Sequence, residues 1–144
     1  MENICCQRAT AGDMPAIAEG IKQLQLDDLD LRWEQFVVAK EGEKIIGFGR
    51  IKTYMDAIEL CSLGVLEGYR GKGISTLLMN DLLKRAGEQS VFVICIIPAY
   101  FEKFGFKPVD NYPDSLIAKY TYCSNTLGGC GEGEKYVVMR KKGL

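Results

Sequence analysis

The glycine-rich segment from Glu67 to Gly73 constrains the fold of this chain more than any other part of the sequence. A mostly apolar, strand-like run, residues 58–66, precedes it, and apolar residues at helical spacing follow it. The helical stripe consists of Ile74, Leu77, Leu78, Leu82 and Ala86. Glycine adopts left-handed backbone angles without a Cβ clash, so Gly71 and Gly73 permit a tight turn directly before a helix. We therefore expect a strand, a short loop and a helix in direct succession.

The same segment has the features of an anion site. The first amide groups of a helix have no intrahelical partner, and they lie at the positive end of the helix dipole. Arg70 and Lys72 add two full positive charges beside these amides. We therefore expect a phosphate or pyrophosphate to bind here, the alternative being an ordinary solvated turn.

Two familiar phosphate motifs do not fit this loop. A P-loop needs a glycine five residues before its Gly-Lys pair and a hydroxyl residue after the pair, but Leu66 and Gly73 occupy these positions. A dinucleotide fingerprint needs a small residue three positions after Gly73, where Thr76 stands. The loop therefore belongs to neither class.

The rest of the chain predicts an α/β (α+β) domain with a mixed central sheet of six or seven strands flanked by helices. The expected strands are residues 4–9, 36–40, 44–52, 58–66, 91–97, 105–107 and 136–140. Pro15 suits the first turn of a helix, and residues 41–43 resemble a hairpin turn. The crossover helix makes the run 91–97 parallel to its predecessor, and a short helix covers 98–103. Residues 113–133, rich in Gly, Ser and Asn, are expected to form an irregular loop.

Length and composition limit the class of protein. A chain of 144 residues fits one domain, residues 1–144, and 47% hydrophobic with 26% charged residues is typical of globular proteins. A net charge of −1 does not favour nucleic acid as a partner. No apolar stretch is long enough to span a membrane, and the first residues do not resemble a secretory signal. We expect a cytoplasmic protein, and a homodimer is compatible with the sequence.

The reactive residue types narrow the chemistry. The chain has no histidine, which excludes histidine-activated nucleophiles and imidazole metal ligands. The six cysteines are expected to be reduced thiols, with Cys61 and Cys95 as small core residues. Cys123 and Cys130 lack the close pairing of zinc ligands, so no metal is expected.

The anion loop resembles the CoA-binding motif of the GNAT acetyltransferase superfamily, in which an Arg or Gln, two residues, a Gly, one residue and a Gly or Ala follow one another. Arg70, Gly73 and Ser75 occupy the motif, with serine in place of the final small residue. Residues 61–65 resemble the fourth strand of the family, and residues 100–106 its second signature. The resemblance implies a GNAT acyl-CoA N-acyltransferase fold and acetyl-CoA as the co-substrate.

Within this superfamily the chain is most similar to the ArgA-like group, the N-acetylglutamate synthase type. The similarity rests on the segment 91–106 and on a later group of residues. That later group consists of Pro113, Lys119, Cys123, Cys130, Val138 and Met139. Phe101 replaces the tyrosine that protonates the leaving thiolate in many members, and Cys61 stands where ArgA-like sequences often have a basic residue. The implied acceptor is a small amine such as glutamate or a related amino acid; a polyamine, a protein or peptide amine, or a CoA sensor without turnover are the alternatives.

The resemblance also implies where the cofactor binds and how the reaction proceeds. The implied contacts to acetyl-CoA are Leu63, Gly64, Val65, Arg70, Gly71, Lys72, Gly73, Ile74, Ser75, Phe101 and Lys103. The amine attacks the thioester directly, while a strand amide, assigned to Leu63, stabilises the tetrahedral oxyanion. Glu59 is the candidate general base, and an exposed strand residue is its alternative.

Five further residues are candidates for the acceptor site. Arg50 and Lys52 lie two apart on one expected strand, so they share a face and would hold a substrate carboxylate; a surface charge pair is the alternative. Trp33 would line the acceptor pocket or else pack in the core. Cys61 and Tyr100 complete this set.

Overall fold

The computed structural model describes residues 3–126 and 136–143. It divides into two compact units made of interleaved segments. The first unit contains Met1–Ile51 and Cys61–Arg85, and the second contains Lys52–Leu60 and Ala86–Leu144. The boundary between the units crosses two strands, so neither unit is one continuous piece of chain. A single domain spanning residues 1–144 stays a prediction.

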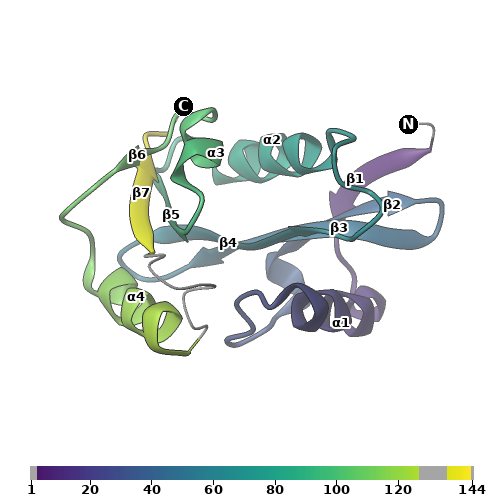
Figure 1. Cartoon of the computed structure of the whole chain (residues 1–144), viewed down its shortest axis with the longest axis horizontal. Helices are drawn as coiled ribbons and strands as arrows, with labels where there is room; N and C mark the ends of the chain where they lie inside the picture. The colour runs from purple at the N-terminus through teal and green to yellow at the C-terminus, as the bar shows by residue number, and fades with distance from the viewer. Residues whose placement is uncertain (1–2, 127–135, 144) are drawn as a thin grey trace. The chain divides into compact units, whose positions relative to one another are not determined.

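Seven strands form a mixed sheet, as the sequence predicts, and their order is β1-β2-β3-β4-β5-β7-β6 (Figure 1). The strands are β1 Ile4–Arg8, β2 Phe36–Glu41, β3 Lys44–Thr53, β4 Ile58–Val65, β5 Val91–Cys95, β6 Lys107–Pro108 and β7 Val137–Lys141. The α-helices are α1 Met14–Leu24, α2 Ile74–Ala86, α3 Pro98–Glu102 and α4 Asp114–Thr126. Two short 3₁₀ helices, η1 Ala11–Asp13 and η2 Trp33–Gln35, precede α1 and β2.

In the first unit, α1 and α2 lie on opposite faces of the strands (Figure 1). Phe48 of β3 points toward α1, where a Cβ on Gly20 would come within 2.6 Å of its ring. The neighbouring glycines of β3 face α2, because a Cβ on Gly49 would lie 2.7 Å from Leu82. Alternation along one strand therefore gives each helix its own face, and the glycines allow close packing.

The core of the first unit lies under α1. Its fully packed members are Ala9, Ile17, Ile21, Phe36, Val38, Ile45 and Phe48. Ile17 and Ile21 are four residues apart, so they project from one face of α1 onto the strands. Burying such a side chain contributes about 1.5–3 kcal/mol, which is the main reason that this short helix is stable.

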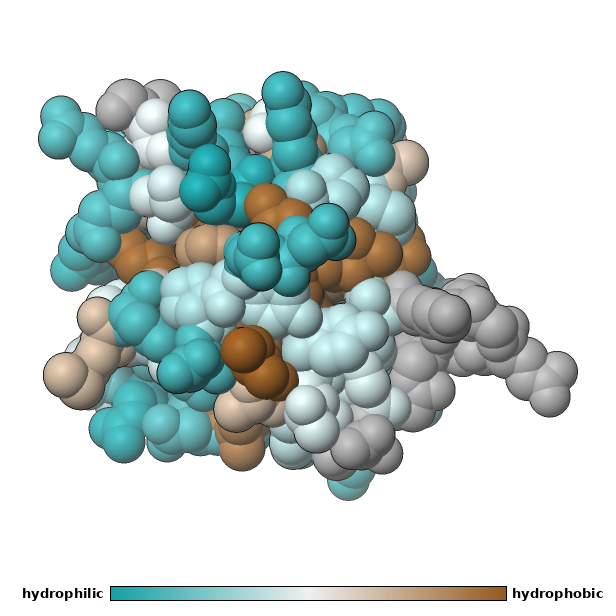
Figure 2. Space-filling view, turned by 90° about the vertical axis from the view of Figure 1, so that its left-hand side faces the viewer, coloured by the Kyte–Doolittle hydropathy of each residue, from teal (hydrophilic) through white to brown (hydrophobic). Residues whose placement is uncertain are grey.

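The second unit is built on β5 and β7. Glu59 of β4 pairs with Phe92 of the parallel strand β5, and β7 is antiparallel to β5. Phe92, Leu116 and Val138 form its core, so α4 packs on these strands. Figure 2 looks onto the side where β6, β7 and α4 lie in Figure 1, and it shows hydrophobic side chains among a mainly hydrophilic surface. None of the described helices has the length and apolar character that crossing a membrane requires.

Two expectations about helices are wrong in part. The segment 113–133 was expected to be an irregular loop, but α4 occupies residues 114–126. Leu116 and Cys123 are seven residues apart and both buried, which is the spacing of one helical face. In α2, Leu77 does not belong to the buried stripe, since 42% of its surface is exposed. Met79 is buried in α2 instead.

Candidate functional site

The loop between β4 and α2 has the backbone conformation that its glycines predict. Gly68, Gly71 and Gly73 all have left-handed φ angles, of 92°, 79° and 78°. A Cβ at any of the three would find no heavy atom within 4 Å. The glycines are therefore needed for the shape of the backbone rather than for packing, and the space beside them is open.

The amide groups at the centre of this loop take no part in the backbone hydrogen bonds of the described residues. Among the described residues, no amide from Arg70 to Gly73 donates to a backbone carbonyl. The helix α2 starts at once, with Ile74 buried as its anchor and Ser75 half-buried in its first turn. The first amides of α2 likewise lack partners within the helix. The loop and helix therefore present several donors to an anion.

Cations gather around this loop. Arg70 and Lys72 are exposed, and Arg70 Nε donates to the carbonyl of Val65 at 3.3 Å. The ammonium groups of Lys72 and Lys44 lie 5.6 and 5.1 Å from the centre of the Tyr69 ring. Lys44 also donates to the Tyr69 hydroxyl at 3.3 Å. Lys44 and Tyr69 were not predicted, because only the fold brings the β2–β3 hairpin to this loop.

The end of β4 leads into the loop and includes three predicted cofactor contacts. Leu63, Gly64 and Val65 are half-buried. A Cβ on Gly64 would lie 2.7 Å from the Leu24 side chain and 2.8 Å from that of Leu26, so a larger residue here would make these two leucines shift. Just before them, Ser62 has a left-handed φ of 52°, which is unusual for a residue inside a strand.

Arg50 was predicted to bind a substrate carboxylate from a strand face, with a surface charge pair as the alternative. Its side chain is 0% exposed, so the surface alternative is wrong. Its guanidinium forms an ion pair with Asp27 at 3.2 Å, and it also contacts the Cys61 thiol. Burial opposes the charge of Arg50, but Cys61 and Asp27 raise the pKa of the guanidinium. A substrate role for Arg50 stays a prediction, and its contacts indicate a different one.

Glu59, the predicted base, is 1% exposed in the second unit. Lys119 Nζ donates to both of its carboxylate oxygens at 3.0 Å, and the Tyr54 hydroxyl donates to one of them at 2.8 Å. The expected alternative, an exposed strand residue, is therefore wrong. A base role for Glu59 stays a prediction, and its contacts with Lys119 and Tyr54 were not predicted.

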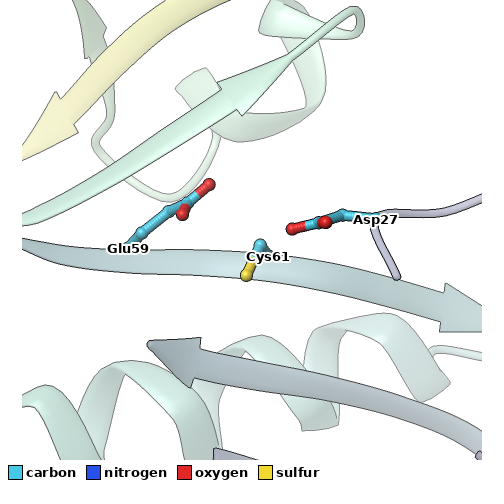
Figure 3. A group of neighbouring side chains, drawn as sticks. All are labelled: Asp27, Glu59 and Cys61. Carbon is cyan, nitrogen blue, oxygen red and sulfur yellow. The ribbon is translucent and has the colours of Figure 1, made fainter. Parts of the chain in front are cut away.

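Figure 3 shows Asp27 on the segment after α1, and Glu59 and Cys61 on β4. Carboxylates and thiols of this kind bind metals when no other cation holds them. In the first unit, however, Arg50 pairs with Asp27 and contacts Cys61. In the second unit, Lys119 pairs with Glu59. A protein cation thus already neutralises each carboxylate, and these residues do not fit a metal ion.

The remaining predicted residues have varied surroundings. Phe101 is buried in α3, where its ring packs edge-on against Tyr100 at 5.1 Å and Phe106 at 5.7 Å, while Lys103 is exposed. The buried hydroxyl of Tyr100 has no hydrogen-bond partner among the described residues. Trp33 is 37% exposed, so it is not a core residue.

The last residues discussed in the sequence analysis are Lys52 and four of the cysteines. Lys52 is buried, with its ammonium 5.6 Å from the centre of the Tyr54 ring. Cys61 and Cys95 are buried, as expected for small core residues, and Cys123 is buried on α4. Cys130 lies outside the described residues.

The loop has left-handed glycines and clustered cations, and it lies between a central strand and the N-terminus of a helix. Proteins that bind phosphate-bearing cofactors use an element of this kind. The sequence model of the Acetyltransferase (GNAT) family matches residues 10–106, which is more than half of the chain. The chain therefore belongs to the GNAT acetyltransferase family, as the loop motif predicted.

A curated relative supports this assignment. The uncharacterized N-acetyltransferase CT2212 of Chlorobaculum tepidum is 28% identical over 143 residues, covering 89% of this chain and 92% of the relative.

Solved structures share the fold. N-acetylglutamate synthase from Neisseria gonorrhoeae, complexed with coenzyme A and N-acetyl-glutamate, has a TM-score of 0.79 at 20% identity. The match covers 96% of this chain but 35% of that one, so the present chain spans about a third of the synthase. Rv2747 from Mycobacterium tuberculosis, in complex with CoA and NLQ, has a TM-score of 0.78 at 21% identity, covering 97% and 99% of the two chains.

Proposed function

We propose that this acetyltransferase takes its acetyl group from acetyl-CoA and transfers it to the amine of a small molecule, glutamate or a related amino acid. The observation that carries the proposal is the loop from Arg70 to Gly73, whose amides have no backbone carbonyl partner among the described residues. An unpaired amide near a protein surface is stabilised by an anion, and a pyrophosphate offers several acceptor oxygens at once.

In this proposal the loop binds the diphosphate of acetyl-CoA. The amides of Gly71, Lys72 and Gly73 donate to its oxygens, together with the first turn of α2, including Ile74 and Ser75. Arg70 and Lys72 neutralise the charge, and Lys44 adds a third cation that Tyr69 holds in place. The two similar structures that contain CoA are consistent with this choice of ligand.

The strand leading to the loop is proposed to bind the pantetheine arm and the thioester. Leu63, Gly64 and Val65 are half-buried, so solvent and a ligand can reach this end of β4. An amide of this strand, assigned to Leu63, donates to the thioester oxygen and stabilises the oxyanion after attack. Such a donor contributes about 10²–10³ in rate when it is held in place before the reaction.

Several classes of amine are candidates for the acceptor of the acetyl group. The similarity in fold to a synthase solved with N-acetyl-glutamate favours an amino acid, which carries both an amine and a carboxylate. Lys52 and Trp33 remain the candidates to bind it, with Tyr100 and Cys61. Glu59 remains the candidate base, although Lys119 and the Tyr54 hydroxyl already donate to its carboxylate oxygens.

The proposal is tested with purified protein, acetyl-CoA and a panel of amines, while the release of free CoA thiol is followed. We expect release with glutamate or another amino acid and saturation at micromolar to millimolar acceptor. Release only with polyamines or peptides would move the acceptor to those classes. No release with any amine, despite CoA binding by calorimetry, would instead support a CoA sensor.

A specific observation keeps that second candidate in view. Phe101 replaces the tyrosine expected to protonate the leaving thiolate, and it is buried among aromatic rings. A binding module with an intact anion loop needs no such proton donor. The thiol-release assay therefore decides between the two functions.

We also propose a cytoplasmic location. The five cysteines that the structure describes are free thiols, and two of them, Cys5 and Cys6, are adjacent on β1. Thiols persist in this form in a reducing compartment. Labelling of intact and lysed cells with a membrane-impermeant thiol reagent would test the location.

A further inference from the structure

Arg50 in β3 uses its whole guanidinium inside the first unit. Its Nε donates to the Ser62 hydroxyl at 3.1 Å. Its Nη1 donates to the Asp30 carbonyl and to the Gln35 amide oxygen, both at 3.2 Å. Its Nη2 donates to the Leu29 carbonyl at 2.9 Å and to the Asp27 carboxylate at 3.2 Å. The planar, rigid fork of donors in arginine suits such a set, which a lysine could not reproduce. One side chain thereby connects β3, β4 and the segment 27–35.

Two of these partners have a strained backbone. Asp30 and Ser62 have left-handed φ angles of 51° and 52°. For a residue with a Cβ this conformation costs roughly 1–2 kcal/mol, and it persists only when the surroundings impose it. Arg50 binds both residues, and the Ser62 hydroxyl in turn donates to the Asp27 carbonyl at 2.8 Å. The cluster is therefore built to hold two unfavourable backbone conformations at once.

We infer that Arg50 is a positioning residue with two roles. Its contact with Ser62 sets the direction of the Leu63 amide. Its contacts with Asp27 and Asp30 hold the segment that carries Trp33. The inference rests on the proposed function, in which that amide stabilises the oxyanion and Trp33 contacts the acceptor. The link to Leu63 is geometric. The peptide group between Ser62 and Leu63 turns with the backbone angles of Ser62, so a clamp on Ser62 fixes where the Leu63 N–H points.

The link to the acceptor runs through the other side of the cluster. Leu29 and Trp33 are 40% and 37% exposed, so the segment 27–35 presents apolar surface to solvent. In this role Arg50 does not bind the acceptor itself, because its donors are engaged with carbonyls and side chains of this segment and of β4. It thus replaces the expected carboxylate contact with a structural one: the same cation orders the acceptor segment and the catalytic strand.

Two substitutions at one position separate this role from simple packing. Ser62→Ala and Ser62→Gly both remove the hydroxyl that Arg50 holds, but only glycine adopts a left-handed φ freely. A packing role predicts that glycine is the more harmful change, because it removes more atoms and adds flexibility. The positioning role predicts the reverse order in turnover, since alanine resists the φ that directs the Leu63 amide.

The experiment measures kcat, and KM for acetyl-CoA and for the best amine, by thiol release. Enzyme concentrations are corrected to the stoichiometry of CoA binding in calorimetry, so that unfolded protein does not count. We expect Ser62→Ala to lower kcat about tenfold to a hundredfold, Ser62→Gly to lower it less, and both to bind CoA within about twofold of the wild type. Arg50→Met should lower kcat and also raise the KM of the amine. The matched control is Arg85→Met, which removes a partly exposed arginine of α2 and should leave both constants unchanged.

The outcomes distinguish the inference from the function beneath it. Suppose that the wild type is active. If both Ser62 variants then keep its kcat, or if Ser62→Gly has a lower kcat than Ser62→Ala, the inference is overturned and the proposed function stands. Absence of thiol release by the wild type overturns the proposed function, and this inference with it. If Arg50→Met does not fold, the two Ser62 variants still decide the question.

Discussion

Lys119 of α4 places its ammonium 3.0 Å from both carboxylate oxygens of Glu59 in β4, and the side chains of both residues are 2% exposed. Taking two charges out of water is unfavourable, and their attraction offsets this cost only when both partners are present. The pair therefore makes the attachment of α4 to its unit depend on a charge.

Lys119→Met should consequently destabilise the protein by about 3 kcal/mol or more, because it leaves a buried and unpaired carboxylate. We expect the midpoint of urea unfolding to fall accordingly. The double variant Lys119→Met with Glu59→Gln removes both charges and should recover much of the loss. If Lys119→Met and the double variant unfold at the same urea concentration, the ion pair does not hold α4, and its apolar contacts alone do so.

The same pair bears on catalysis. If Glu59 is the general base, Glu59→Gln should lower kcat by about 10²–10⁴. If Glu59 only secures α4, the folded fraction of Glu59→Gln should keep most of its turnover. CoA stoichiometry gives the folded fraction in each case.

The left-handed glycines of the anion loop lead to a prediction about CoA binding. Gly73→Ala should weaken CoA binding tenfold or more, because alanine opposes the φ of 78° and turns the loop amides away. Calorimetric titration with CoA measures the change. Gly42→Ala is the matched control, since Gly42 has a φ of 62° in the β2–β3 turn and equally open surroundings. It should lose similar stability while its affinity for CoA stays within about twofold of the wild type.

The sequence was sufficient to predict the loop but not the charge clusters. Glycines and cations at fixed spacing from a strand and a helix are local features, so Gly71, Gly73 and Arg70 could be recognised directly. The partners of Arg50 lie 12 or more residues away along the chain, and Lys119, the charged partner of Glu59, lies 60 residues away. No local pattern distinguishes a lysine such as Lys119 from a solvated one.

The helix α4 is a second feature that the sequence analysis did not predict. Its apolar face consists of a few residues, and Lys119, which the pairing with Glu59 buries, interrupts the pattern. The sequence after it is rich in glycine, and that composition dominated the prediction of a loop. Tertiary packing on Phe92 and Val138 decided the structure here, against a weak local signal.

Asp13 gives a prediction about pH. Burial alone would raise the pKa of this carboxyl, but hydrogen bonds from Thr10 and Lys40 lower it below the ordinary value. A lowered folded-state pKa stabilises the protein above the unfolded pKa of about 3.9, and the stabilisation is lost as pH falls through the folded value. Asp13→Asn should therefore lower the melting temperature by about 3 °C at pH 7 and by less at pH 3. If the difference in melting temperature between Asp13→Asn and the wild type is the same at both pH values, the effect does not come from the charge of Asp13.

Tyr100 is adjacent to Phe101, which stands in the place of the proton-donating tyrosine, and its buried hydroxyl has no partner among the described residues. A buried hydroxyl without a partner is destabilising, so Tyr100→Phe should leave the melting temperature unchanged or raise it. If that hydroxyl protonates the leaving thiolate, the same variant should lose about 10²–10³ in kcat while it binds CoA normally. A more stable and fully active variant would show instead that the thiolate leaves without a proton from Tyr100. Phe104→Leu, which alters the ring packed 5.3 Å from Tyr100, controls for disturbance of the aromatic cluster.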